Sequence, residues 1–445
     1  INFSHGSHQD HALVIRNLRE AARELNRPVT ILQDLSGPKI RTGEMPNGPV
    51  ELIQGKQLIL TTEEVPGSQE IVQVNYTDLP QSVIIGGRIL LDDGRLELVV
   101  KGVKGKQVIT EVIQGGLLKS HKGINLPGAN LKMRALTEKD QEDLAFGLTQ
   151  DIDVLALSFV RSGEDIKRLR QTILEINPER AKIPIIAKLE HPDAIKNLHE
   201  ILHAADGVMV ARGDLGIEMP PESVPIIQKR IVASANKHLS YVIIATQMLD
   251  SMVDNPRPTR AEASDVANAV LDGSDAVMLS GETAIGKFPI KTVDMMASII
   301  SQSEEHSDEW GHMSYDITAD SSHDDAVYIT RAARELAQDR AVAAIAVFTR
   351  SGRTARLMSK ARPKVPILAF TPDEHTYQYL SMLWGTTPYL IPHADTIEEM
   401  ISHVDAAVIE GTPVKAGQEI VIIAGFPIHK MVPPNLALLH TVQSQ

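Results

Sequence analysis

The chain has a repeating pattern in which short apolar runs, rich in β-branched residues, alternate with amphipathic stretches. Six runs are nearly all apolar and end in polar residues: 28–36, 152–160, 183–190, 207–214, 241–247 and 275–282. Such runs are typical of parallel strands that are buried on both faces. From residue 152 onward, a run begins about every 24 to 35 residues, the length of a strand, a helix and two loops. The pattern therefore predicts a series of βα units.

The polar residues at the ends of the runs help to distinguish between two possible folds. Six βα units fit either a (β/α)8 TIM barrel or an open, doubly wound sheet. An open sheet gathers its chemistry at one switch point, whereas barrel enzymes collect it from the carboxyl ends of many strands. Because nearly every run ends in polar side chains, we predict an α/β fold built on a (β/α)8 TIM barrel. Residues 1–6 are expected to be the end of a further strand.

Two other regions depart from the barrel pattern. Short alternating segments in residues 44–130, with glycine turns at Asp93-Gly94 and Gly102, predict a small inserted all-β domain. Charged residues flank its entry and exit, so we expect a lid that excludes water from the barrel mouth, with a spacer as the alternative. After an acidic, aperiodic stretch, βα alternation resumes. The predicted parts are a barrel (1–43 and 131–302), the lid (44–130), a linker (303–325) and a C-terminal α/β regulatory domain (326–445).

Composition narrows the classes of function. The 445 residues include no cysteine, which excludes disulfides, zinc–thiolate sites and thiol nucleophiles. A formal net charge of −13 disfavours nucleic acid or an anionic membrane as partner. No apolar run approaches the roughly 18 residues of a membrane span, and the start at Ile1 has no signal-peptide pattern. We expect a cytoplasmic protein, and a plastid-targeting segment upstream of Ile1 stays the open alternative.

Three charged residues at neighbouring strand ends predict a metal-assisted phosphoryl-transfer site. Residues i and i+2 of a strand share a face, so Lys188 and Glu190 point the same way, and Asp214 ends the next run. Two carboxylates suit Mg²⁺ completed by substrate oxygens, and the lysine could neutralise a transferring phosphoryl group. The alternative is a Lys–Glu ion pair beside a helix-capping aspartate. Thr246 ends another run and fits either a turn cap or the same site.

A second candidate site lies in the C-terminal domain. The loop between an apolar run and a helix is dense in hydroxyls and arginines: Thr349, Arg350, Ser351, Gly352, Arg353 and Thr354. Such a loop, with the free amides of a helix start, predicts a phosphate site for a regulatory ligand; an ordinary helix cap is the alternative. The histidines form no HExxH pattern, and we expect no histidine metal cluster.

Several motifs resemble pyruvate kinase in sequence and in order. They are NFSHG, GPKIRTG, KGINLPG, AKLE, ARGDLG, ATQMLDSM, the long block from Asn255 to Ala284, and FTRSGRT. The resemblance covers nearly the whole chain. It implies glycolytic phosphoryl transfer from phosphoenolpyruvate to ADP, giving pyruvate and ATP, in an allosteric homotetramer. The runner-up is a metal-dependent carbon–carbon lyase of the same barrel type, and a catalytically inactive metabolite sensor is a further alternative.

The resemblance also implies residue roles. Lys188 stabilises the transferring phosphoryl group, and Glu190 and Asp214 bind Mg²⁺ or Mn²⁺. Gly213 and Thr246 contact the substrate, with Thr246 on the face where the enolate is protonated. Arg41 and Lys122 match residues that contact the nucleotide phosphates, and Arg41 also counts among the catalytic residues. Asn2 and His5 lie on the same side and are included in the nucleotide site.

The stretch Asp34-Leu35-Ser36-Gly37-Pro38-Lys39 departs from the pattern of potassium-dependent members, which read Asp-Thr-Lys-Gly-Pro-Glu. Leucine and lysine at these positions resemble members that work without K⁺. Lys39 is then a built-in substitute cation. The remnants of the monovalent-cation site would be Asn2, Ser4 and Asp34.

Two further departures concern the ends of the chain. The family has an arginine two positions before Asn2, so we expect the natural protein to be longer at its N-terminus. The C-terminal stretch lacks the glycine-rich loop of members activated by fructose 1,6-bisphosphate. A sugar monophosphate or a nucleotide is therefore the expected effector.

Overall fold

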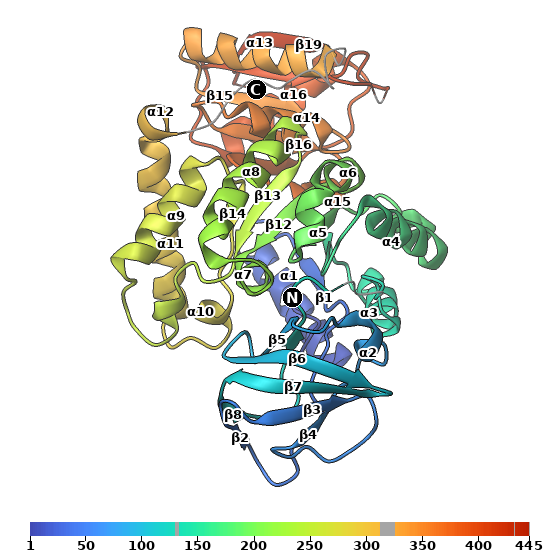
Figure 1. The fold of residues 1–445 in the computed structure, drawn as a ribbon. Coiled ribbons are helices and arrows are strands. Elements are labelled where there is room, and N and C mark those ends of the chain that lie inside the picture. The colour runs from blue at the N-terminus through green and yellow to red at the C-terminus, as the bar shows by residue number, and fades with distance from the viewer. Residues whose placement is uncertain (130–132, 312–324, 431, 445) are drawn as a thin grey trace.

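The computed structural model describes residues 1–129, 133–311, 325–430 and 432–444. Figure 1 shows three parts in a row, with the inserted β domain and the C-terminal domain at opposite ends of the barrel. The predicted α/β fold with a barrel, an inserted β domain and a C-terminal α/β domain is confirmed. No helix in the described ranges has both the length and the apolar character needed to cross a membrane.

A parallel six-stranded sheet forms the barrel wall in the order β1-β10-β11-β12-β13-β14. All six predicted runs contain one of its strands: β1 (Leu32–Leu35), β10 (Val154–Leu157), β11 (Ile185–Leu189), β12 (Gly207–Ala211), β13 (Tyr241–Ala245) and β14 (Ala276–Val277). Asn2 pairs in parallel with Asp34, as expected for the end of a further strand. Most of these strand residues are fully buried, which explains their continuous apolar sequence.

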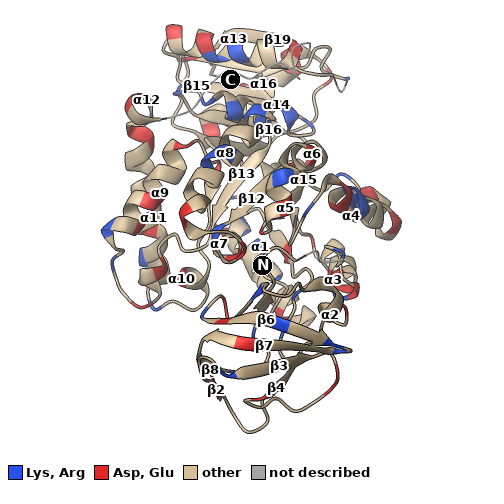
Figure 2. Ribbon diagram, viewed as in Figure 1, with Lys and Arg blue, Asp and Glu red and all other residues tan. Residues whose placement is uncertain are grey.

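Helices cover the outer face of this sheet. They are α1 (His8–Glu24), α3 (Glu138–Leu148), α4 (Gly163–Ile176), α5 (Pro192–Lys196), α6 (Leu198–Ala204), α7 (Arg212–Glu218), α8 (Val224–Lys237), α9 (Arg260–Leu271), α10 (Gly281–Ala284), α11 (Pro289–Glu305) and α12 (Ser307–Trp310). Capping boxes begin several of them, as at Ser7 with Asp10 and Thr259 with Glu262. In Figure 2 the strands β12 and β13 are tan, whereas the helices around them carry many acidic and basic residues.

The inserted domain is a mixed sheet in the order β4-β3-β7-β6-β5-β9, with a separate β2-β8 pair. Its elements are β2 (Val50–Leu52), β3 (Gln57–Thr61), β4 (Ile71–Gln73), α2 (Leu79–Ser82), β5 (Arg88–Leu91), β6 (Leu96–Lys104), β7 (Gln107–Gln114), β8 (Gly116–Leu118) and β9 (Ile124–Asn125). The turn at Asp93-Gly94 has positive φ at both residues, as predicted. The turn predicted at Gly102 is wrong. Gly102 lies inside β6, where the pairing with β7 shifts register, so the glycine marks a bulge.

The C-terminal domain is a five-stranded sheet in the order β17-β16-β15-β18-β19. Its elements are α13 (Asp325–Asp339), β15 (Ala344–Phe348), α14 (Arg353–Ala361), β16 (Ile367–Thr371), α15 (Glu374–Leu380), β17 (Thr386–Leu390), α16 (Ile397–Gly411), β18 (Glu419–Ala424) and β19 (Leu436–Thr441). The sequence pattern did not predict β19, which pairs antiparallel with β18. The first part of the expected linker is helical. Residues 303–310 continue in α11 and α12, and 312–324 lie outside the described residues.

One apolar cluster joins the barrel to the C-terminal domain. Val154, Ile186 and Tyr241 from the barrel strands belong to the same buried cluster as Ile345 and Ala355. Tyr241 is 1% exposed, at the start of β13. The C-terminal domain therefore packs against the amino-terminal ends of the strands, and the carboxyl ends stay available at the opposite side.

Candidate functional site

Lys188 lies at the centre of a group of polar side chains on the carboxyl ends of three neighbouring strands. Its Nζ lies 2.8 Å from the Oγ of Ser158, 3.0 Å from Oε1 of Glu190 and 3.1 Å from Oδ1 of Asp34. Parallel register accounts for this arrangement, because β1, β10 and β11 are successive neighbours in the sheet. The structure therefore brings together Lys188 and Glu190, as predicted from their spacing, and adds Asp34, which was expected in the monovalent-cation site. Ser158 was not among the predicted site residues.

The buried charged groups of this site shift one another's pKa values. Burial opposes the charge of Lys188, but Glu190 and Asp34 outweigh it and raise the pKa of its ammonium above the ordinary value. Burial raises the pKa of Asp34, although Lys188 acts in the opposite direction. Lys188 thus keeps its proton and presents a positive charge in a site from which most water is excluded. Such a charge acts strongly on an approaching anion.

Asp214 and Glu190 are the carboxylates that could hold a divalent metal ion. Asp214 lies in the first turn of α7, and burial together with the charge of Glu190 raises its pKa to about 6. Glu190 is 2% exposed, and its Oε2 accepts a hydrogen bond from the amide of Phe159. The buried Glu190 and the half-buried Asp214 repel one another, and carboxylate oxygens are the ligands that Mg²⁺ prefers. The residues present therefore fit a divalent cation.

Thr246 is held in an unusual conformation beside Gly213. Its φ is 71°, and that of Gln247 is 55°, which is rare for non-glycine residues and an outlier for a β-branched one. The Oγ1 of Thr246 accepts a hydrogen bond of 2.8 Å from the amide of Gly213 and donates to the carbonyl of Ala245. Strain of this kind clusters at functional sites. A methyl group on Gly213 would lie 3.4 Å from the same oxygen, a tight approach.

Arg212 and Asp265 hold this turn and were not predicted as site residues. Arg212 donates to the carbonyl of Thr246 at 2.8 Å and to Oδ2 of Asp265 at 2.6 Å. A cavity of about 850 Å³ opens here, lined by Asp214, Gly213, Thr246 and Arg212 from the barrel and by Asp93 from the inserted domain. The sequence offered a signal for Arg212, which stands next to Gly213 and Asp214 in ARGDLG. Asp265 lies in the block from Asn255 to Ala284 that carries the resemblance, but nothing in the sequence placed it beside Arg212.

Arg41 and Lys122 lie on two paired segments where the chain enters and leaves the inserted domain. Arg41 forms a bridge with Gly123 and donates to the carbonyl of His121 at 3.0 Å. The Nζ of Lys122 lies 2.7 Å from Oδ1 of Asp92. Asn2 and His5 lie on the exposed N-terminal segment next to β1. Lys122 pairs through its backbone with Thr42, the residue after Arg41, so the two basic residues lie at neighbouring positions of paired segments, while Asn2 and His5 belong to a different segment.

Lys39 contacts the group predicted as a monovalent-cation site. Its Nζ donates to the Oγ of Ser4 at 3.0 Å, and the Oδ1 of Asn2 accepts from the amide of Ser4. Lys39 also lowers the pKa of Asp214, against the stronger effect of burial. The ammonium of Lys39 therefore lies close enough to the barrel mouth to act on its carboxylates.

The loop 349–354 borders a separate cavity of about 250 Å³ in the C-terminal domain. Thr349, Arg350, Ser351, Arg353 and Thr354 line one side, and Lys430 lines the other. Gly352 has a φ of 75°, and a methyl group there would lie 1.7 Å from the hydroxyl of Tyr379, so this position accepts only glycine. The structure thus brings the predicted loop residues to one cavity at the start of α14.

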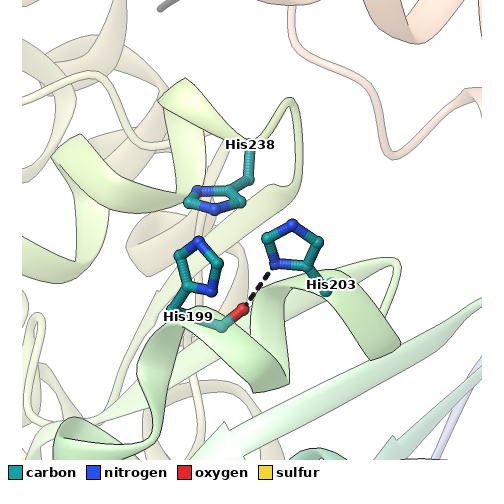
Figure 3. Close-up of side chains that lie close together, drawn as sticks. All are labelled: His199, His203 and His238. Atoms are coloured by element: carbon teal, nitrogen blue, oxygen red, sulfur yellow. Dashed lines mark hydrogen bonds between the residues drawn. The ribbon is translucent and has the colours of Figure 1, made fainter. Parts of the chain in front are cut away.

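We expected no histidine metal cluster, but three histidines lie close enough together to share an ion. Figure 3 shows His199 and His203 on α6 facing His238 at the end of α8. The spacing of His199 and His203, four residues apart, was visible in the sequence. The third ring arrives only through the packing of α6 beside α8, which the sequence did not reveal.

Comparison with known proteins identifies the relatives of this chain. Residues 1–293 match the family model of the pyruvate kinase barrel domain, and residues 328–440 match that of the pyruvate kinase alpha/beta domain. A pyruvate kinase of Geobacillus stearothermophilus is 44% identical over 99% of this chain and 75% of its own length. One of Mycobacterium tuberculosis is 42% identical over 99% and 92%. The crystal structure of a pyruvate kinase from Cryptosporidium parvum superposes with a TM-score of 0.91 at 35% identity, covering 99% of this chain and 90% of its own.

Proposed function

The chain belongs to the pyruvate kinase family, and from this premise we propose how its residues divide the work of the reaction. The protein is a phosphotransferase that uses a divalent metal ion to convert phosphoenolpyruvate and ADP into pyruvate and ATP. The family match does not favour the carbon–carbon lyase that was the runner-up. The observation that carries the residue roles is the contact of Lys188 with Glu190, Asp34 and Ser158. A coupled assay should detect pyruvate only when phosphoenolpyruvate, ADP and a divalent metal are all present.

Lys188 is proposed to bind the phosphoryl group during transfer. Phosphoryl transfer passes through a loose transition state whose charge is spread over three oxygens. An ammonium that is already fixed in place stabilises this charge without reorganisation. Glu190 and Asp214 would hold Mg²⁺ or Mn²⁺, which when bound supplies positive charge to the substrate oxygens. These carboxylates and the lysine thus balance one another until the anionic substrate arrives.

Thr246 is proposed to act where the enolate of pyruvate is protonated. Its hydroxyl is fixed by the amide of Gly213, and its backbone carbonyl by Arg212. A fixed hydroxyl can position a proton, directly or through one water, on one face of the enolate. Gly213 is proposed to let the substrate approach the backbone closely, because it carries no side chain.

Arg41 and Lys122 are proposed to bind the phosphates of the nucleotide, with Asn2 and His5 on the same side. Both basic residues lie where the inserted domain joins the barrel. Closure of that domain would bring their charges toward the barrel mouth and exclude water. We assign residues 44–130 to this lid, residues 1–43 and 131–302 to the barrel, and residues 303–325 to the connection with 326–445.

Lys39 is proposed to replace K⁺ as the monovalent cation beside Asn2, Ser4 and Asp34. Lys39→Glu should make activity depend on added K⁺, by about tenfold or more, because a carboxylate near the site needs an external cation. The measurement is the initial rate against phosphoenolpyruvate, with and without K⁺, at constant ionic strength. Lys56→Glu, at an exposed position of the inserted domain, is the matched control. High activity of Lys39→Glu that is indifferent to K⁺ would show that this proposal is wrong.

The loop 349–354 is proposed to bind a phosphorylated effector, a sugar monophosphate or a nucleotide. Its hydroxyls, its arginines and the start of α14 supply donors for a phosphate. Thr354→Val keeps the shape of the side chain but removes one donor, so half-maximal activation should need about tenfold more effector. Basal activity should not change. Titration with each candidate effector tests this, with Thr387→Val on β17 as control; no response to either class of effector would refute the assignment.

The oligomeric state and the cellular compartment are also proposals that rest on the family. We propose a homotetramer, in which contacts between barrels and between C-terminal domains transmit the effect of the effector. The curated relatives named above are bacterial, and we propose the bacterial cytoplasm as the place of action. Sedimentation of the intact chain tests the tetramer.

A further inference from the structure

Three histidines form a cluster at the opposite end of the barrel strands from Lys188 and Thr246. His203 lies at the end of α6, which leads into β12, and His238 directly follows α8, which leads into β13. The amino ends of these strands are therefore near the cluster, whereas Lys188 and Thr246 lie at or beyond the carboxyl ends. The ligand atoms of His199, His203 and His238 all lie within 4.8 Å of one another.

Two of the three rings are already oriented as metal ligands. The Nδ1 of His203 lies 2.8 Å from the carbonyl oxygen of His199, and the Nδ1 of His238 lies 2.8 Å from that of Ser234. A carbonyl can only accept, so each Nδ1 carries the hydrogen and donates it. In the neutral ring, Nε2 then keeps its lone pair for a metal. Metal-binding histidines characteristically make this second hydrogen bond, which fixes the tautomer and the ring direction.

The arrangement of the rings also favours a shared ion over simple stacking. His238 meets His199 and His203 edge-on, at centroid distances of 5.1 and 4.9 Å, while His199 and His203 are 4.3 Å apart and tilted by 40° (Figure 3). Bonds of about 2.1 Å to a central ion require only a modest closing of the rings. His199 and His203 are exposed on α6, so their side chains can make this movement and an ion has free access.

We propose that His199, His203 and His238 bind a transition-metal ion of the zinc class, with water completing the coordination. Three imidazoles suit Zn²⁺, Ni²⁺ or Cu²⁺, whereas Mg²⁺ prefers oxygen ligands. The site is therefore chemically distinct from the carboxylates Glu190 and Asp214, and it does not depend on the proposed residue roles.

A bound ion would connect two segments that hold the C-terminal domain. Asp206 follows α6 and lies 3.8 Å from Arg356 of α14, and Asn236 of α8 accepts a hydrogen bond from Lys360. The ion would tie α6 to the end of α8, and so fix the surface on which α14 packs. Because it binds only the folded arrangement, it should raise the melting temperature.

The test uses the intact chain, freed of metal by a chelator and returned to saturating Mg²⁺. Titration calorimetry with Zn²⁺ should find one site per chain. His203→Gln and His238→Gln should each weaken Zn²⁺ binding by at least about tenfold. Loss of a residue that only hydrogen-bonds to a metal ligand already lowers the affinity by about that much, and loss of the ligand itself should lower it at least as far. Zn²⁺ should raise the melting temperature of the wild type by a few degrees, but not that of the two variants. His375→Gln, an exposed histidine on α15, is the control and should bind like the wild type.

Two results would overturn the proposal. One is equal Zn²⁺ affinity in His203→Gln, His238→Gln and the wild type, which would place the ion elsewhere. The other is a wild type that binds no Zn²⁺ in the presence of Mg²⁺. Circular dichroism verifies that each variant is folded, and His199→Gln, at an exposed position, serves if either of the others is not.

Discussion

Lys188→Met should lower kcat by about 10³-fold or more, the range found when a charge that stabilises a transition state is removed. The side chain is 13% exposed, so methionine can occupy the same space without its charge. Phosphoryl transfer would then lose the ammonium that faces the developing charge. The measurement is kcat at saturating phosphoenolpyruvate, ADP and metal, together with the melting temperature.

The control for this substitution is Lys196→Met. Lys196 lies on the next helix along the chain, is 72% exposed and forms a surface ion pair with Asp193. It should keep normal turnover, since exposed pairs contribute little. Lys188→Met should also keep its response to the effector in binding assays, because the loop 349–354 belongs to another domain. Unchanged turnover in Lys188→Met would remove the lysine from its proposed role.

The sequence predicted that Lys188 and Glu190 share a face, because this depends on alternation within one strand. Lys188 and Glu190 are two residues apart at a strand end, and parallel register then brings Asp34 and Ser158 alongside. The sequence could not predict the left-handed backbone of Thr246, because no local signal marks it. It also missed β19, whose antiparallel pairing with β18 breaks the repeating βα pattern. Contacts between distant segments, such as His238 with α6, depend on packing that no periodicity encodes.

The ion group between the barrel and the C-terminal domain is another such distant contact. Asp275, just before β14, accepts hydrogen bonds from Lys360 and from Arg362, the latter at 2.7 Å. The three side chains are 5% exposed or less. One carboxylate is therefore shared by two buried cations. Burial accordingly lowers the pKa of Lys360 to about 8, although Asp275 acts against this shift.

Asp275→Asn should destabilise the protein by about 3–5 kcal/mol, because it removes the charge of the carboxylate that both buried cations contact. Lys360→Met should cost far less, since it removes one of two like charges that repel each other and keeps the pair of Asp275 with Arg362. Asp254→Asn is the surface control, since its pair with Lys287 is 68% exposed on both sides. It should change stability by less than about 1 kcal/mol. Denaturant unfolding of the three variants under identical conditions measures these differences.

Helix α14 links this buried ion group to the proposed effector loop. Lys360 and Arg362 stand at the end of α14 and just after it, and α14 begins at the loop 349–354. The same helix thus connects the proposed effector loop to the amino end of a barrel strand. Asp275→Asn should therefore lower the stability of the protein and also weaken its activation by the effector. Lys360→Met should keep more of the stability and more of the activation. Equal stability of Asp275→Asn and Asp254→Asn would mean that the buried group does not hold the two domains together.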